Sequence, residues 1–170
     1  DKKGKGNEGL KSIDSFPYVA TSGSRAAVDP AFYLDDFYDK GEITENSKAA
    51  IMCQRVYQNY WQQPKTVTSK LGEVADGVLN GQLIFCDPLT TSKGRNFHRE
   101  IKKTLVAYGI PENEIAIING AENSTPEKKK AVQDAFNSGK YRVVIGNTAG
   151  MGEGMDLQRY CTDIHHMDVP

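Results

Sequence analysis

The chain has 170 residues, 38% hydrophobic and 25% charged, a balance that is typical of one globular domain and excludes collagen-like, coiled-coil and largely disordered chains. Its longest apolar runs, such as residues 83–86, are far too short to cross a bilayer, so no membrane segment is expected. The formal net charge of −1 argues against a protein that holds nucleic acid by its overall charge, and any polyanion site must therefore be local.

The amino-terminal part of the chain predicts little regular structure. Residues 1–45 are rich in Gly, Ser, Asp and Pro without a sustained apolar period, which is typical of an irregular arm or linker with one short helical turn near residues 32–38. The basic start is followed by no hydrophobic region or cleavage site, so no secretory signal is expected. Because the sequence begins without Met, we expect a fragment of a longer protein.

The cysteines exclude two kinds of site. Cys53, Cys86 and Cys161 are odd in number, far apart and without paired spacing. This pattern indicates neither a disulfide framework nor a zinc site, so we expect no metal ligands and a reducing, cytoplasmic location.

From residue 46 onward the pattern predicts one domain, residues 46–170, of helices and strands. Asn46 or Ser47 can cap a helix with one apolar face that ends by Pro64, and residues 63–80 form either a surface insertion or a short weak helix. Two further helices are expected, from about residue 95 to 108 and from a capping box at 124–127 to Gly139. Alternation of these helices with strands implies right-handed crossovers and a parallel sheet with helices on both faces, an α/β fold. The predicted strands are residues 82–86, 115–118, 142–145 and 164–169.

The loop after the third predicted strand is a candidate phosphate site, because ligands of open parallel sheets bind beyond the carboxyl ends of the strands. Residues 146–156 contain four glycines and end in an acid. Glycines let backbone N–H groups approach phosphates, Thr148 offers a hydroxyl to a phosphate oxygen, and Asp156 can accept a ribose hydroxyl. A glycine loop that merely turns the chain is the alternative.

A complete phosphate loop is missing from the sequence. Residues 4–12 look like one, but Leu10 separates Gly9 from Lys11 and no strand precedes them. No other Gly-x-x-x-x-Gly-Lys-Ser/Thr occurs, nor an Asp-Glu pair after an apolar strand. We therefore expect that the chain does not hydrolyse ATP alone.

Five segments in order resemble the carboxy-terminal RecA-like lobe of superfamily-two helicases, including the Swi/Snf-type translocases, over about half the chain. The segments are QLIFCD at 82–87, ING at 118–120, DAFN at 134–137, RVVIGNTAGMGEGMDLQ at 142–158 and HHMDVP at 165–170. The sequences of the last two segments are most similar to helicase regions of methylase–helicase polyproteins carried by phages and mobile elements. The resemblance implies a RecA-like parallel sheet flanked by helices.

The resemblance also implies a nucleic-acid contact. Thr148 matches the family threonine that contacts the nucleic-acid backbone, and Asn119 with Gly120 matches a loop beside the bound strand. Lys93 and Arg95 are further candidates, because their loop follows the carboxyl end of the first predicted strand. The expected partner is DNA, with RNA as the alternative.

An ATP contact is implied at the other end of the same loop. Gly152, Gly154 and Asp156 match positions near ATP at the interface between two lobes. The whole protein would then use ATP and Mg, and this lobe would pair with an amino-terminal RecA-like lobe of the same chain. An associated methylase domain is a further expected partner. This chain ends before the family's arginine-rich motif, and Lys129 stands where many members have Arg. The isolated fragment is therefore expected to be inactive and to require no cofactor.

The remaining charged residues have simpler explanations. Arg99 and Lys102 share a helix face opposite the apolar one, which predicts a solvated surface, as does the run at 128–130. Asp87 and Asp168, near strand ends, are the carboxylates to test after Asp156.

Histidines and aromatic residues predict packing more than chemistry. His98 is expected on the surface, and His165 and His166 alternate between the two faces of a strand without metal-ligand spacing. Trp61 could stack on bases, but its helical spacing from Tyr57 favours packing.

Two other functions are compatible with the sequence. One is a free-standing Rossmann-like module that binds a nucleotide or sugar nucleotide through residues 146–156 without a partner lobe. The other is an inactive lobe that serves as a protein-interaction scaffold.

Overall fold

The computed structural model describes residues 47–62, 65–68, 74–78, 80–87, 96–152 and 154–167. The predicted arm with its helical turn near residues 32–38, and the candidates Lys93, Arg95 and Asp168, lie outside the described residues.

Four parallel strands form the central sheet, which confirms the predicted α/β fold. They run in the order β4-β5-β3-β6. The last strand was predicted at 164–169, and its start is wrong, because Cys161 already pairs with Gly81 at the start of β3. The predicted residues 168 and 169 lie outside the described residues. The bounds are β3 Gly81–Phe85, β4 Ile115–Ile118, β5 Val143–Gly146 and β6 Cys161–His166.

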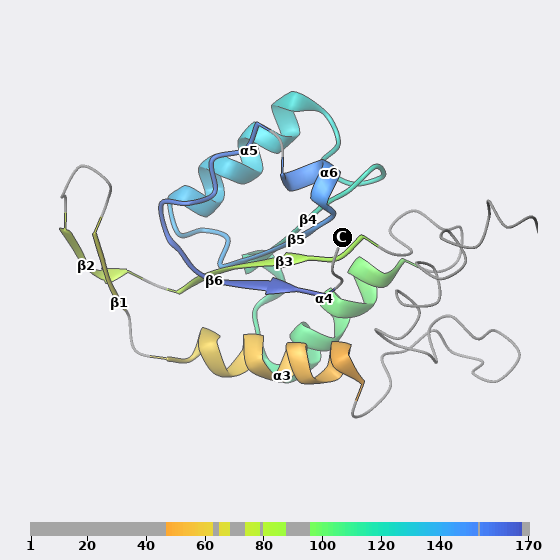
Figure 1. Ribbon diagram of the computed structural model, residues 1–170, viewed down its shortest axis with the longest axis horizontal. Helices are drawn as coiled ribbons and strands as arrows, with labels where there is room; N and C mark the ends of the chain where they lie inside the picture. The colour runs from red at the N-terminus through yellow and green to blue at the C-terminus, as the bar shows by residue number, and fades with distance from the viewer. Residues whose placement is uncertain are drawn as a thin grey trace, which may run out of the picture.

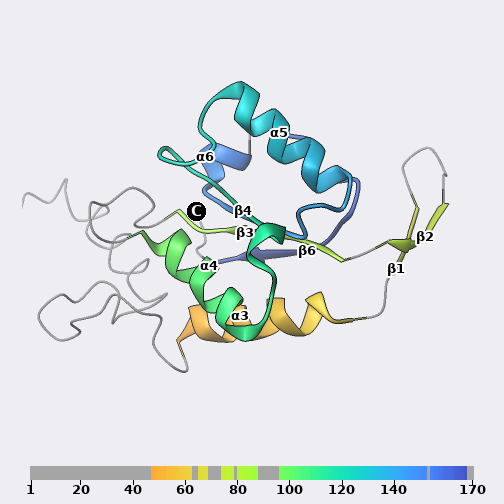
Figure 2. The ribbon, with the colours of Figure 1, turned by 180° about the vertical axis from the view of Figure 1, so that it is seen from behind.

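Helices cover both faces of this sheet (Figure 1). The long helices α3, Lys48–Tyr60, and α4, Phe97–Tyr108, lie on one face, and α5, Pro126–Asn137, with the short α6, Thr148–Met151, lies on the other. A 3₁₀ turn, η2 Glu112–Glu114, leads into β4. The rear view in Figure 2 shows the same two layers, so each sheet face has its own apolar core.

Residues 63–80 contain an antiparallel hairpin of β1, Lys65–Thr68, and β2, Val74–Val78. The weak-helix alternative for this segment is wrong. Residues 66–68 are all β-branched, and β2 both begins and ends with Val. β-branched residues favour strands. The hairpin extends away from the four-stranded sheet (Figures 1 and 2).

Ser47 caps α3 as predicted and accepts a hydrogen bond from the Ala50 N–H at 3.1 Å. The capping box predicted at 124–127 is wrong in its cap, because Thr125, just before Pro126, accepts from the Lys128 N–H in place of Ser124. Gly109 ends α4 at a φ of 111°. The helix α5 buries Val132 and Phe136 against the sheet, whereas Ala131 is exposed.

Polar side chains from the sheet layer fasten the carboxyl half of α3. Gln82 Nε2 donates to the Val56 carbonyl at 2.9 Å, and Arg142 Nη2 donates to the Tyr60 carbonyl at 2.7 Å. The Arg142 guanidinium also lies 3.9 Å from the Tyr60 ring centroid, while the Tyr60 hydroxyl donates to Glu114 at 2.7 Å. These buried bonds fix where α3 ends against the sheet.

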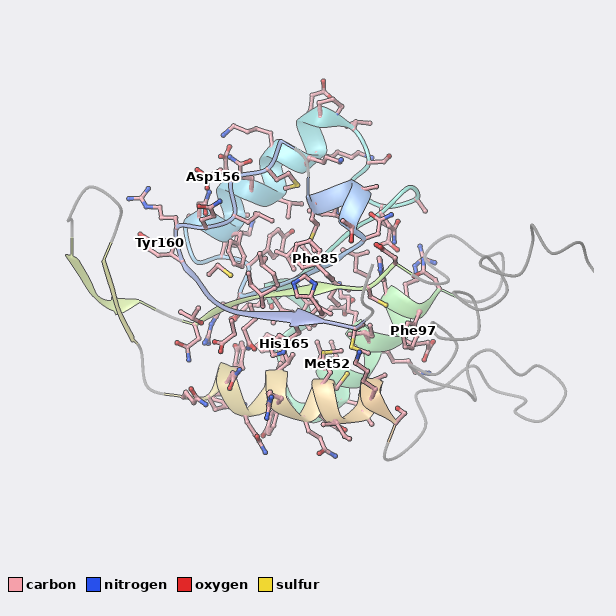
Figure 3. The ribbon with its side chains drawn as sticks, viewed as in Figure 1. Met52, Phe85, Phe97, Asp156, Tyr160 and His165 are labelled. Atoms are coloured by element: carbon pink, nitrogen blue, oxygen red, sulfur yellow. The ribbon has the colours of Figure 1, made fainter. Side chains whose placement is uncertain are left out.

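Stability is expected to fall as the pH drops below about 6.5, because of His165. Its Nε2 lies 3.0 Å from Gln82 Oε1 on the α3 side of the sheet (Figure 3). Burial lowers the pKa of His165, the Arg55 charge adds to this, and Asp163 opposes it. The unfolded chain therefore takes up the proton first, which favours unfolding from about pH 6.5 downward.

Urea unfolding at about pH 7.5 and about pH 5.5 measures this effect. His165→Gln should reduce the loss of stability between the two pH values, whereas the exposed neighbour variant His166→Gln should retain it. An unchanged loss in His165→Gln would contradict the assignment.

Candidate functional site

The carboxyl ends of β3 and β5 form a topological switch point. The two strands are adjacent and parallel, but the chain leaves β3 toward α4 on one face and leaves β5 toward α6 on the other. Connections that diverge in this way leave a crevice beyond the strand ends, which is where open α/β sheets bind ligands.

A hydrogen bond crosses this switch point. The backbone N–H of Thr148 donates to Asp87 Oδ1 at 2.6 Å, which joins the end of β5 to the end of β3. Asn147 caps α6 by accepting from the Gly150 N–H at 2.9 Å. Thr148 itself is exposed. Asp87, singled out for its position near a strand end, thus holds the turn that carries Thr148.

Gly146 is required by close packing at this turn. A Cβ at this position would lie 2.6 Å from Met151 Cγ and 2.8 Å from the Ile118 carbonyl oxygen. The absence of a Cβ at Gly146, the first glycine of the candidate phosphate loop, therefore allows α6 to pack closely on the ends of β4 and β5.

Asn119 and His98 form a buried pair at the end of β4. His98 Nδ1 lies 3.2 Å from Asn119 Nδ2, and His98 Nε2 lies 2.7 Å from the Cys86 carbonyl oxygen. The expectation that His98 is on the surface is wrong, because its side chain is fully buried between these two partners. Asn119 is buried as well, which leaves Gly120 as the exposed residue of that loop.

Of the three predicted ATP contacts, Gly152 ends α6 and donates its N–H to the Thr148 carbonyl at 2.7 Å, whereas Asp156 lies along α5. The Asp156 N–H donates to Gln133 Oε1 at 3.1 Å, and Asn137 Nδ2 donates to the Asp156 carbonyl at 2.8 Å. Figure 3 shows Asp156 beside α5, on the opposite sheet face from Phe97. Gly152, Gly154 and Asp156 are all exposed. The structure therefore separates the nucleic-acid candidate Thr148 from Asp156, but not from Gly152.

A cavity of about 400 Å³ adjoins this segment of the chain. Its lining includes Ser124, Lys129, Lys130, Gln133 and Gly154. Lys130 is paired with Asp134 at 2.7 Å, and Lys129 is half-buried, which departs from the expected solvated run. The cavity offers cationic side chains beside the backbone of the glycine loop.

The other candidates keep ordinary roles. Arg99 pairs with Glu122 at 2.7 Å and Lys102 with Glu112 at 3.5 Å, in keeping with a solvated helix face. Trp61 remains 61% exposed. Its ring meets that of Tyr60 edge-on at a centroid distance of 5.0 Å.

Sequence reasoning missed His98, Gln133 and Asn137 as parts of the site. DAFN belonged to the resemblance, but nothing in it indicated that its Asn would hold the Asp156 carbonyl. Neither a protein-family model nor a curated protein sequence matches the chain. No helix among the described residues is both long and apolar enough to span a membrane, and the same residues contain no group of three or more potential metal ligands.

Proposed function

We propose that the chain is the carboxy-terminal RecA-like lobe of a superfamily-two helicase or translocase of DNA. In this proposal it binds the nucleic-acid backbone at the carboxyl edge of its sheet and completes an ATP site when joined to an amino-terminal lobe. The observation that carries the proposal is the Thr148–Asp87 bond across the switch point, together with the separation of Thr148 from Asp156.

Support for the nucleic-acid contact comes from exposure and position. Gly120 and Thr148 are exposed at the ends of the adjacent strands β4 and β5. A backbone amide and a hydroxyl are suited to phosphate oxygens and carry no sequence preference. Asp87 occupies the Thr148 N–H, which leaves the Thr148 hydroxyl as the phosphate donor.

Support for the nucleotide contact comes from the way α5 holds Asp156. Gln133 and Asn137 bind both sides of its backbone, and Asp156 Oδ1 accepts from the Gln158 N–H at 3.3 Å, which leaves Oδ2 for a ribose hydroxyl. Gly152 and Gly154 precede it with exposed backbone. The amino-terminal lobe would supply the lysine that grips ATP phosphates and the Mg site, since the sequence of this chain contains no phosphate loop.

Thr148→Ala is expected to weaken binding of single-stranded DNA about fivefold, because a neutral hydroxyl-to-phosphate bond contributes about 1 kcal/mol. Fluorescence anisotropy of the chain with labelled oligonucleotides at about 50 and about 200 mM salt measures this. Affinity should fall steeply with salt and not depend on base sequence. Thr104→Ala, on α4, is the matched control and should bind as the wild type does. Binding that is indifferent to salt, or equal in both variants, would contradict the proposal.

A free-standing nucleotide-binding module is the second candidate, favoured by the cavity beside Gly154. Calorimetric titration of the chain with ATP in the absence of any other lobe distinguishes the two. Tight binding that Lys129→Ala abolishes would support the module, whereas the helicase lobe requires its partner for tight binding.

A further inference from the structure

The carboxyl edge contains one buried histidine that neither the resemblance nor the proposed contacts use. His98 lies in the first turn of α4 and is fully buried. Its two ring nitrogens reach residues just beyond two strands, with Nε2 at the Cys86 carbonyl after β3 and Nδ1 at the Asn119 amide after β4.

These partners determine where the His98 proton resides. A backbone carbonyl oxygen only accepts, so Nε2 carries the hydrogen that points at Cys86. Nδ1 is then an acceptor, and it faces the Nδ2 of Asn119, which donates. The Asn119 amide is oriented independently, because its Oδ1 accepts from the N–H groups of Ala121 at 2.9 Å and Glu122 at 2.8 Å. The neutral Nε2–H tautomer satisfies every one of these bonds.

The same amide shapes the exposed turn at residues 119–122. Besides the two bonds to its Oδ1, the Asn119 N–H donates to the Glu122 carbonyl at 2.9 Å. The turn is thus closed around one side chain, with Gly120 exposed at its tip. Whatever holds the Asn119 amide holds the Gly120 backbone.

We propose that His98 is a positioning residue for nucleic-acid binding, which acts through Asn119 to fix the Gly120 turn relative to the end of β3. The inference rests on the proposed function. Cys86 precedes Asp87, which binds the Thr148 N–H, so one chain of bonds runs from Gly120 to Thr148 through His98. A phosphate backbone that touches both residues requires their spacing to be fixed in advance.

Two substitutions of His98 separate its bonds. In His98→Gln the side-chain Nε2 can still donate to Cys86, but no acceptor remains at the δ position for Asn119. In His98→Asn the Oδ1 can still accept from Asn119, while the bond to Cys86 is lost. We expect His98→Gln to weaken binding of a labelled single-stranded oligonucleotide about fivefold, the equivalent of one hydrogen bond. His98→Asn should bind within about twofold of the wild type.

Amide hydrogen exchange gives a readout that a general loss of packing would not reproduce. His98→Gln should speed exchange at Ala121 and Glu122 while leaving the Gly150 amide, which Asn147 holds, unchanged. If His98→Gln does not fold, Asn119→Ser removes the same bond from the other side, together with the Oδ1 contacts to Ala121 and Glu122, and should lower affinity at least as far. If all variants fold, the two substitutions together should cost no more affinity than Asn119→Ser alone.

The outcomes distinguish this inference from the proposed function. Failure of the wild type to bind oligonucleotide at low salt would overturn the proposed function and the inference with it. If the wild type binds and His98→Gln binds equally well, the positioning role alone is overturned. Additive losses of affinity in the double variant would overturn it as well.

Discussion

Replacing Phe136 with alanine is expected to lower the free energy of unfolding by about 3–5 kcal/mol. Phe136 is 1% exposed and belongs to the apolar core between α5 and the sheet, with Leu83 and Val144. Its ring also abuts Gly81, where a Cβ would come within 2.8 Å of Cζ. Truncation leaves a cavity that the rigid start of β3 cannot fill, because partial collapse alone does not recover the lost contacts.

Denaturant unfolding followed by circular dichroism measures this loss, with Lys128→Ala as the control on an exposed position of the same helix. The control should change stability by less than about 0.5 kcal/mol. Because Asn137 is the next residue and holds the Asp156 carbonyl, Phe136→Ala should also release the Asp156 segment. A loss of stability below about 1 kcal/mol would mean that α5 is not a principal support of the core.

Local patterns accounted for most of the fold. The apolar spacing of α3, its cap Ser47 and the end of α4 at residue 108 are properties of short segments, and the structure confirms each. The alternation of β3, α4, β4 and α5 then restricted the topology to parallel crossovers. Short-range patterns missed the β1–β2 hairpin and the short helix α6, and they placed the start of β6 too late, because the pairing of Cys161 with Gly81 joins residues that are far apart in the chain.

The site was less accessible to sequence reasoning because its contacts are distant in the chain. Asp87 and Thr148 are 61 positions apart, and the distance between them depends on which strands become neighbours. His98 was expected on the surface because of its residue type. Its burial is tolerated only because the Cys86 carbonyl and the Asn119 amide satisfy both ring nitrogens.

The glycine loop illustrates why composition left two interpretations open. Gly146 is demanded by packing against Met151 and Ile118, and Gly154 adopts a φ of 74°, which other residues rarely accept. Both needs exist without any ligand. The exposed Thr148 and Asp156, and the residues that hold them, therefore indicate a function more strongly than the number of glycines does.

Gly146→Ala tests whether the packing of α6 on the strand ends positions Thr148. The substitution is expected to lower stability and nucleic-acid binding together. The added Cβ would lie 2.8 Å from the Ile118 carbonyl oxygen, a backbone atom at the end of β4, and 2.6 Å from Met151 Cγ. We expect a loss of about 1–3 kcal/mol in unfolding free energy, because α6 must move away from the strand ends. Thr148 begins α6, so its bond to Asp87 should be lost and affinity for single-stranded DNA should fall at least as far as in Thr148→Ala.

A second substitution separates the two contacts behind this effect. Adding Met151→Ala to Gly146→Ala removes the side-chain clash but leaves the Ile118 oxygen in place, so it should restore DNA affinity more than stability, since Met151 is itself buried. Ala149→Ser, on the exposed side of α6, is the matched control and should change neither quantity appreciably. If Gly146→Ala lowers stability but binds DNA as tightly as the wild type, the seat of α6 does not position Thr148, and the carboxyl edge of the sheet is not where the backbone of the nucleic acid lies.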